Sequence, residues 1–207
     1  MWDLLKHLWP DFSQMLNGTT NGISAWFWSL TFLIFALSLF FLFKHYRNFI
    51  EKNKALRSLL DGQDRETLAD SRREILQRAK KLDANNIGLL WQEFDESLVL
   101  SSDKKQLFNT IDAEHFFNAK NLATGLTSSR LLAATPSFLV AIGVLGTFVG
   151  LTIGLEGLVG NTTEIETLKS GINKLISGAA VAFMTSVWGV TFSLLLNLIE
   201  KLFERSA

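Results

Sequence analysis

Residues 131–155 read LLAATPSFLVAIGVLGTFVGLTIGL, a run of 25 residues without Asp, Glu, Lys, Arg or His. Two further runs without these residues lie at 23–43 and 175–199. At about 1.5 Å rise per residue, each run would span roughly 32 to 38 Å as a helix, enough to cross a hydrocarbon core of about 30 Å with some tilt. Buried helices of a soluble domain usually have shorter apolar runs with polar interruptions. The three runs therefore predict an all-α integral membrane protein with three transmembrane helices.

The composition argues against several classes of function. The 207 residues include 20 Lys plus Arg and 20 Asp plus Glu, and this balance argues against a nucleic-acid binder. No cysteine is present, which excludes disulfides, thiol nucleophiles and cysteine-ligated metals. His7, His45 and His115 lie far apart, so we expect no metal site. Because the sequence also has no glycine-rich phosphate loop and no nucleophile elbow, we expect neither an enzyme nor a bound cofactor.

Charge asymmetry predicts the orientation in the membrane. Five basic residues follow the first run closely, whereas only Lys6 precedes it; the five are Lys44, Arg47, Lys52, Lys54 and Arg57. The positive-inside rule then places the N-terminus outside and the C-terminus in the cytoplasm. The predicted order is a periplasmic segment (1–22), the first span (23–43), a helical cytoplasmic domain (44–130), the second span (131–155), a periplasmic loop (156–174), the third span (175–199) and the start of a cytoplasmic helix (200–207).

The predicted cytoplasmic domain contains three helical stretches. The first reaches about Leu82, with an interruption at Asp61-Gly62, and a turn follows at residues 83–86. The second is predicted over Ile87–Leu100, and the third leads into the membrane. Glu93, Asp95 and Glu96 are expected on the exposed side of the second helix, where a solvated face is the ordinary interpretation. Docking of a cytoplasmic effector at Glu93 and Glu96 is the alternative.

The second and third spans have a face of small residues that the first span lacks. Gly143, Thr147, Gly150 and Gly154 recur at i, i+4, i+7 and i+11, and Gly178, Ala182, Thr185 and Gly189 repeat this spacing. Small residues on one face let membrane helices approach closely. We therefore expect close packing at Gly143, Gly146, Gly150, Gly154, Gly178, Ala182 and Gly189. The first span is bulky and aromatic, and suits lipid contact.

Two threonines on these faces are candidates for an ion pathway. Thr147 and Thr185 lie eight and ten residues from the outer ends of their spans, roughly 12 and 15 Å, so they share a depth. Each could simply donate to its own helix backbone. Alternatively, the two hydroxyls could form a polar ring in an assembly, with Ser186, Ser193 and Asn197 continuing the polar stripe. No span contains Asp or Glu, so a proton-carrying carboxylate would come from another chain.

Pro136 allows two interpretations. It lies near the inner start of its span, where a first-turn proline costs little because its missing N–H would have had no partner there. A proline can also kink a helix that flexes during a functional cycle. We favour first-turn placement.

The stretches at 136–151 and 178–189, together with Trp91–Leu98, resemble the MotA/TolQ/ExbB proton-channel superfamily, and most of all its ZorA family from the Zorya anti-phage defence systems. The resemblance covers roughly residues 20–203. It implies a homopentamer in the bacterial inner membrane around two copies of a ZorB-like single-span partner with a membrane Asp and a peptidoglycan-binding domain. Proton flow, with sodium as the alternative ion, would drive rotation. Thr147, Thr185 and Ser186 fall where the family places pore hydroxyls.

Two features depart from the superfamily pattern. Some relatives carry a glutamate about one turn before the third-span hydroxyl, whereas Ala180 and its neighbours here are apolar. Relatives in the defence systems also continue into a long cytoplasmic helical tail. This chain stops at Ala207 within an amphipathic helix, so we expect either a truncated or a tail-less form.

The resulting hypothesis is a proton-driven motor or channel subunit that converts ion flow into a mechanical signal for anti-phage defence. A second possibility is an ExbB/TolQ-like energiser of outer-membrane processes. A third is a membrane scaffold that conducts no ions, in which the small-residue faces only hold helices together.

Overall fold

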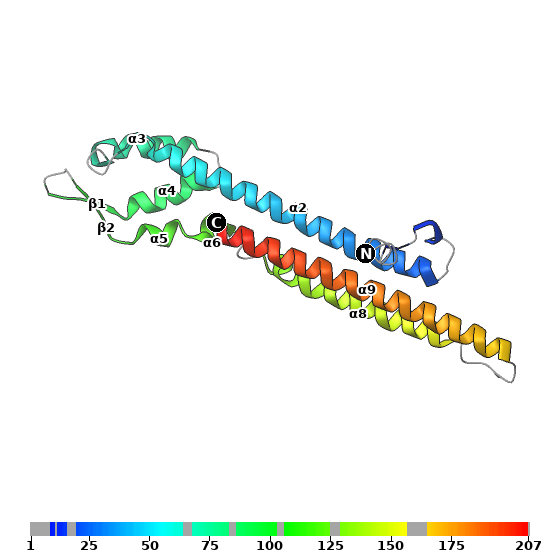
Figure 1. Cartoon of the computed structure of the whole chain (residues 1–207). Helices are drawn as coiled ribbons and strands as arrows, with labels where there is room; N and C mark the ends of the chain where they lie inside the picture. Colours follow the sequence, from blue (N-terminus) through cyan, green and yellow to red (C-terminus); the bar gives the residue numbers. More distant parts are fainter. Residues whose placement is uncertain are drawn as a thin grey trace. The chain divides into compact units, whose positions relative to one another are not determined.

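The structure is a computed structural model that describes residues 9–10, 12–15, 20–63, 68–82, 86–102, 106–124, 129–156 and 165–206 (Figure 1). The described residues form two compact units, one from residues 1–41 and 130–202 and the other from 42–129 and 203–207. The elements in chain order are the 3-10 helix η1 (Phe12–Gln14), α2 (Thr20–Leu60), α3 (Leu68–Lys81), α4 (Ile87–Glu96), β1 (Leu98–Leu100), β2 (Leu107–Asn109), α5 (Ala113–Phe116), α6 (Ala119–Leu122), α8 (Arg130–Glu156) and α9 (Ile165–Ser206).

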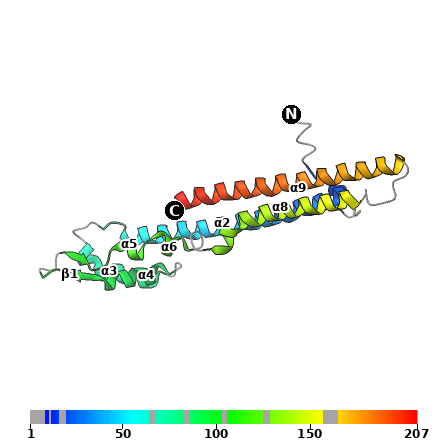
Figure 2. The ribbon, with the colours of Figure 1, turned by 90° about the horizontal axis from the view of Figure 1, so that it is seen from below.

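The first unit is built from the three apolar helices. The helices α2, α8 and α9 are long and apolar enough to cross a membrane, and each contains one of the three uncharged runs. Figures 1 and 2 show α8 lying beside α9, which is the longer helix. The expected set of three apolar helices of membrane-spanning length is therefore present.

Two of these helices extend well beyond the predicted spans. Residues 165–174 are expected in a loop but form the first turns of α9. The segment contains no proline, so every residue in it can take part in helical hydrogen bonds. Likewise α2 passes Phe43 without a break and ends at Leu60. It stops at the predicted interruption, where Gly62 has a φ of 75°, a left-handed conformation that glycine adopts without strain.

Pro136 lies inside α8 and not in its first turn, so the favoured interpretation is wrong. The helix already begins at Arg130, so a full turn of helix precedes the proline. Pro136 is buried. Prolines are tolerated inside membrane helices, where neighbouring groups satisfy the backbone groups that the proline leaves free.

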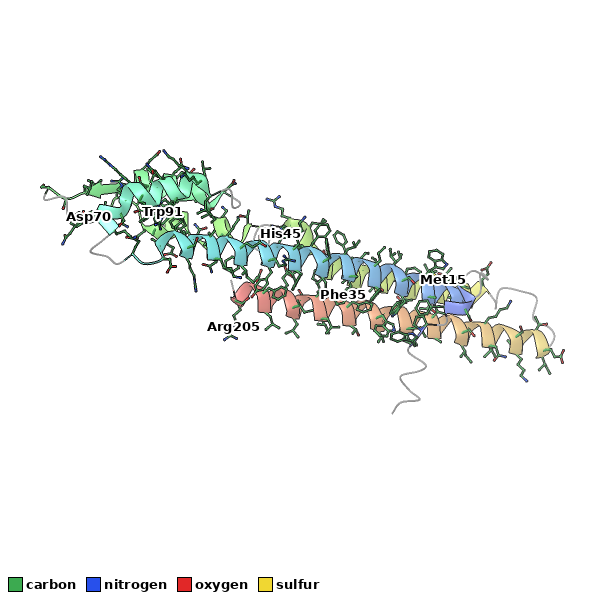
Figure 3. The ribbon with its side chains drawn as sticks, turned by 90° about the horizontal axis from the view of Figure 1, so that it is seen from above. Met15, Phe35, His45, Asp70, Trp91 and Arg205 are labelled. Atoms are coloured by element: carbon green, nitrogen blue, oxygen red, sulfur yellow. The ribbon has the colours of Figure 1, made fainter. Side chains whose placement is uncertain are left out.

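The second unit has its own small core. Leu59 of α2, Ile75 and Ala79 of α3, and Ile87 and Trp91 of α4 are buried together. The α3 and α4 residues are spaced i, i+4, so each pair lies on one helical face. Figure 3 labels Trp91 in this unit.

The segment after α4 differs from the all-α prediction. The helix ends at Glu96 and not at Leu100, and residues 98–100 form β1, which pairs antiparallel with β2 so that Val99 lies opposite Phe108. Ser97 ends the helix: its hydroxyl donates to the Phe94 carbonyl, and its own carbonyl accepts from the Thr110 N–H. The predicted third helical stretch is replaced by β2 and the short helices α5 and α6.

The expected exposed face of α4 is also partly wrong. Glu93 and Glu96 are exposed, but Asp95 is buried. The Arg72 guanidinium from α3 donates to both Asp95 carboxylate oxygens, at 2.8 and 3.2 Å, and to the Asp95 carbonyl at 2.6 Å. A buried carboxylate needs such a partner. Residues 83–85 of the predicted turn lie outside the described residues.

Candidate ion pathway

The contact between α8 and α9 is built from backbone against backbone. A Cβ placed on Gly143 would lie 3.2 Å from the Gly189 Cα, and one on Gly150 would lie 2.8 Å from the Gly178 carbonyl oxygen. A Cβ on Gly154 would lie 3.3 Å from the Gly178 Cα. These glycines therefore meet along one seam, and side chains at these positions would hold the two helices apart.

At the centre of this seam, Gly146 lies against the Thr185 side chain. A Cβ on Gly146 would lie 2.6 Å from the Thr185 Oγ1 and 2.7 Å from its Cβ, so the glycine makes room for the threonine side chain. Thr147 follows Gly146 directly and therefore lies close to the level of Thr185. The buried face of α8 runs through Gly143, Gly146 and Gly150, while Thr147 is half-buried at its edge.

Both threonine hydroxyls donate to their own helix. The Thr147 Oγ1 lies 2.5 Å from the Val144 carbonyl oxygen, and the Thr185 Oγ1 lies 3.0 Å from the Ala182 carbonyl oxygen. Thr185 is buried in the seam and Ser186 is half-buried beside it. The other two residues of the predicted polar stripe differ in exposure: Ser193 is buried and Asn197 is exposed. Thr147 and Thr185 thus lie at one level of the α8–α9 pair, and each hydroxyl donates to a carbonyl group of its own helix.

Aromatic side chains of α2 pack against the C-terminal half of α9. Phe35 stacks on Phe192 with ring centroids 4.9 Å apart, and Figure 3 shows Phe35 between the two helices. Trp28 packs edge-on against Trp188, and its indole N–H is buried without a hydrogen-bond partner among the described residues. Phe40 is exposed. One side of the first apolar run therefore packs within the chain, and its other side is exposed.

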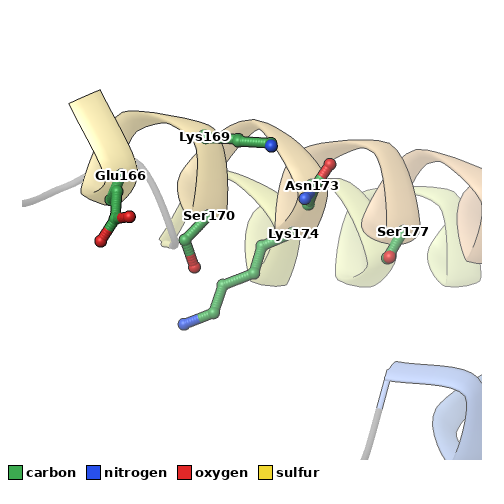
Figure 4. Close-up of a pocket in the computed structure, with 6 residues that line it drawn as sticks. All are labelled: Glu166, Lys169, Ser170, Asn173, Lys174 and Ser177. Atoms are coloured by element: carbon green, nitrogen blue, oxygen red, sulfur yellow. The ribbon is translucent and has the colours of Figure 1, made fainter.

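The N-terminal end of α9 presents polar side chains that the sequence analysis does not single out. They line an open depression of about 470 Å³ and lie on one side of the helix (Figure 4); they are Glu166, Lys169, Ser170, Asn173, Lys174 and Ser177. Their i, i+3, i+4, i+7 spacing is a helical signal. All of these residues except Ser177 fall in the segment predicted as a loop (156–174), where no helical face is expected.

The other candidate residues lie in the second unit. Glu93 and Glu96 are exposed, and neither forms an ion pair within the described part of the chain. The described residues contain no group of three His, Asp or Glu side chains that could hold a metal ion.

Comparison with known proteins identifies the family. The family model of the anti-phage protein ZorA of Zorya type I systems matches residues 17–205, which include the whole seam. The chain belongs to the ZorA-like family. Two curated ZorA proteins from Escherichia coli are similar to it. One, from an ETEC strain, is 30% identical over 118 residues, covering 54% of this chain and 16% of the relative. The other, from strain Crooks, is 39% identical over 82 residues, covering 38% and 14%.

These ZorA relatives are much longer than the present chain, which spans about one sixth of the first and one seventh of the second.

Proposed function

We propose that this chain is the ring-forming subunit of a proton-driven rotary motor in the bacterial inner membrane. Five copies surround the transmembrane helices of two copies of a ZorB-like partner, with their N-termini outside and their C-termini in the cytoplasm. Ion flow through this assembly produces the mechanical signal for anti-phage defence. Protons are the proposed coupling ion, and the subunit itself carries out no chemical reaction.

One observation carries this proposal: two hydroxyls lie at one level of a seam whose helices contain no carboxylate within their apolar runs. A hydroxyl both donates and accepts a hydrogen bond, so it can contact a carboxylate in its protonated and its ionised state. The titrating group would come from the ZorB-like partner. Thr147, Thr185 and Ser186 would then form the polar wall around it.

Replacing Thr147 and Thr185 together by valine tests this role. Valine has the shape of threonine, so the contact of Thr185 with Gly146 survives while both hydroxyls are lost. We expect phage protection and partner-dependent proton flux to fall at least about tenfold, because a transmembrane proton site loses its hydrogen-bonding wall. The mass of the solubilised complex should not change.

The matched control replaces Thr31 and Thr152 by valine. Both donate to carbonyl groups of their own helices, as Thr147 and Thr185 do, but they lie elsewhere in α2 and α8. We expect this control to retain activity. A fully active Thr147→Val, Thr185→Val protein would contradict the assigned role.

A scaffold that conducts no ions is the second candidate. Its support is that both hydroxyls already have acceptors within their own helices. Under that function the valine variants protect as well as the unchanged protein. Docking of a cytoplasmic effector at the exposed Glu93 and Glu96 belongs to either candidate, and charge reversal at both residues tests it.

A further inference from the structure

The second unit contains a pocket of about 420 Å³ formed by three separate elements. His45, Asn48 and Lys52 contribute from α2, Asn86 from the start of α4, and residues 122–124 from the end of α6. The three α2 residues are spaced i, i+3 and i+7, so they lie on one face of that helix. This convergence distinguishes the pocket from the open depression on α9, which is lined by one helix alone.

The chemistry of this pocket suits an anion. Its described lining residues include an ammonium, an imidazole, two amides and a hydroxyl, and none of them is acidic. The Lys52 Nζ donates to the Asn121 carbonyl oxygen at 3.3 Å and forms no ion pair with any residue that the structure describes. Burial lowers the pKa of Lys52, because removal from water disfavours the charged form. An anion beside the ammonium would offset that cost.

The position along α2 indicates where such an anion comes from. His45 lies two residues and Lys52 nine residues beyond Phe43, the end of the predicted span, so they are roughly 3 and 13 Å beyond the hydrocarbon edge. The headgroup layer on each side is about 5 to 7 Å thick. Helix side chains lean toward the helix N-terminus, which for this segment is the membrane side. Position 52 itself therefore lies beyond the headgroup layer, and its long side chain, leaning toward the membrane, brings the ammonium closer to that layer.

We propose that this pocket binds a phosphate group, and that the phosphate belongs to an anionic phospholipid of the cytoplasmic leaflet. His45 and Asn48, which lie nearer the membrane along α2, hydrogen-bond the phosphate, and the Lys52 ammonium approaches it from the cytoplasmic side. The choice of leaflet rests on the proposed orientation of the chain in the membrane. Bound lipid would then tie the second unit to the membrane surface.

The test uses the full chain, purified in detergent and stripped of lipid. Native mass spectrometry counts phospholipid adducts after titration with phosphatidylglycerol or with phosphatidylcholine. We expect phosphatidylglycerol to bind, and phosphatidylcholine to bind at least about fivefold more weakly. Lys52→Gln should weaken phosphatidylglycerol binding by about fivefold or more, because one charge-assisted hydrogen bond is lost.

Two other lysines on α2 serve as matched controls. Lys44 and Lys54 are exposed and do not line the pocket. Lys44→Gln and Lys54→Gln each remove one positive charge near the same membrane surface, and each should change binding less than about twofold, since a general surface charge is screened. Equal losses in all three variants would overturn the proposal in favour of general surface attraction. Unchanged binding by Lys52→Gln would also overturn it.

A competition with inorganic phosphate distinguishes the two sources of the anion. Lysine-dependent binding of inorganic phosphate, with no binding of phosphatidylglycerol, would overturn the assignment to lipid. The lipid titration measures neither proton flux nor phage protection. A negative lipid result therefore leaves the motor proposal standing, and failure of the threonine test leaves this one standing.

Discussion

Arg72 of α3 and Asp95 of α4 form an ion pair in the second unit. Their side chains are 25% and 10% exposed, and their closest atoms are 2.8 Å apart. Glu74 and Arg78 on α3 form a pair of almost the same length, 2.7 Å, with both side chains largely exposed. Equal distances do not mean equal contributions to stability, because water screens the exposed pair and also hydrates its groups when they separate.

Asp95→Asn should destabilise the second unit, because it leaves the Arg72 guanidinium partly buried without a counter-charge. We expect a loss of about 1 to 3 kcal/mol in the free energy of local opening. Hydrogen exchange of the α3 and α4 amides in the full chain measures this loss. Glu74→Gln is the matched control, with an expected change below about 0.5 kcal/mol. Equal effects of the two changes would show that burial does not determine the strength of the Arg72 pair.

At the scale of elements, α8 and α9 meet through glycines whose tolerance to an added methyl group differs along the seam. An alanine at 150 would put its Cβ 2.8 Å from the Gly178 carbonyl oxygen and 2.9 Å from the Ala182 nitrogen, both backbone atoms that cannot move alone. At Gly154 the nearest atoms, including the Leu175 Cα, would be 3.2 Å away. Small local shifts can accommodate the second change more easily than the first.

Gly150→Ala should therefore destabilise the helix pair more than Gly154→Ala. We expect about 1 to 3 kcal/mol for the first, the usual cost of overpacking, and less than half of that for the second. Thermal unfolding of the detergent-solubilised protein, followed by tryptophan fluorescence, compares the two variants. The opposite order of melting temperatures would mean that the seam opens in the detergent-solubilised protein.

For the whole molecule, the proposal divides the work between two polypeptides. The apolar runs of α2, α8 and α9 supply hydroxyls and glycines but no titratable group. A titratable group is normally required for proton transfer through a membrane protein. The ring alone should therefore be a closed structure, and the ZorB-like partner should complete the path.

Proton flux into liposomes tests this division. The purified chain alone should leak no faster than empty liposomes, and addition of the ZorB-like partner should raise the flux by at least about tenfold. A partner in which the membrane Asp is replaced by Asn is the control, since it keeps the assembly and removes the titratable group. Selective proton flux through the chain without its partner would contradict the division of work.

Several features followed from the sequence alone. The three apolar runs predicted α2, α8 and α9 because membrane-spanning length and apolarity are properties of one continuous segment. The interruption at Asp61-Gly62 was predictable for a similar reason, since glycine favours a turn locally. The spacing of the glycines also indicated which helices would have small-residue faces.

Only the tertiary structure decided how these features meet. It put Gly146 and not Thr147 under the Thr185 side chain, buried Asp95 against Arg72, and paired residues 98–100 with 107–109. Each of these outcomes depends on residues far apart in the chain or on neighbouring elements. Periodicity describes one element at a time, so it does not specify which edge of a face is covered or where a charge finds its partner. Those choices follow from packing between elements, where a single glycine or a single carboxylate decides the geometry.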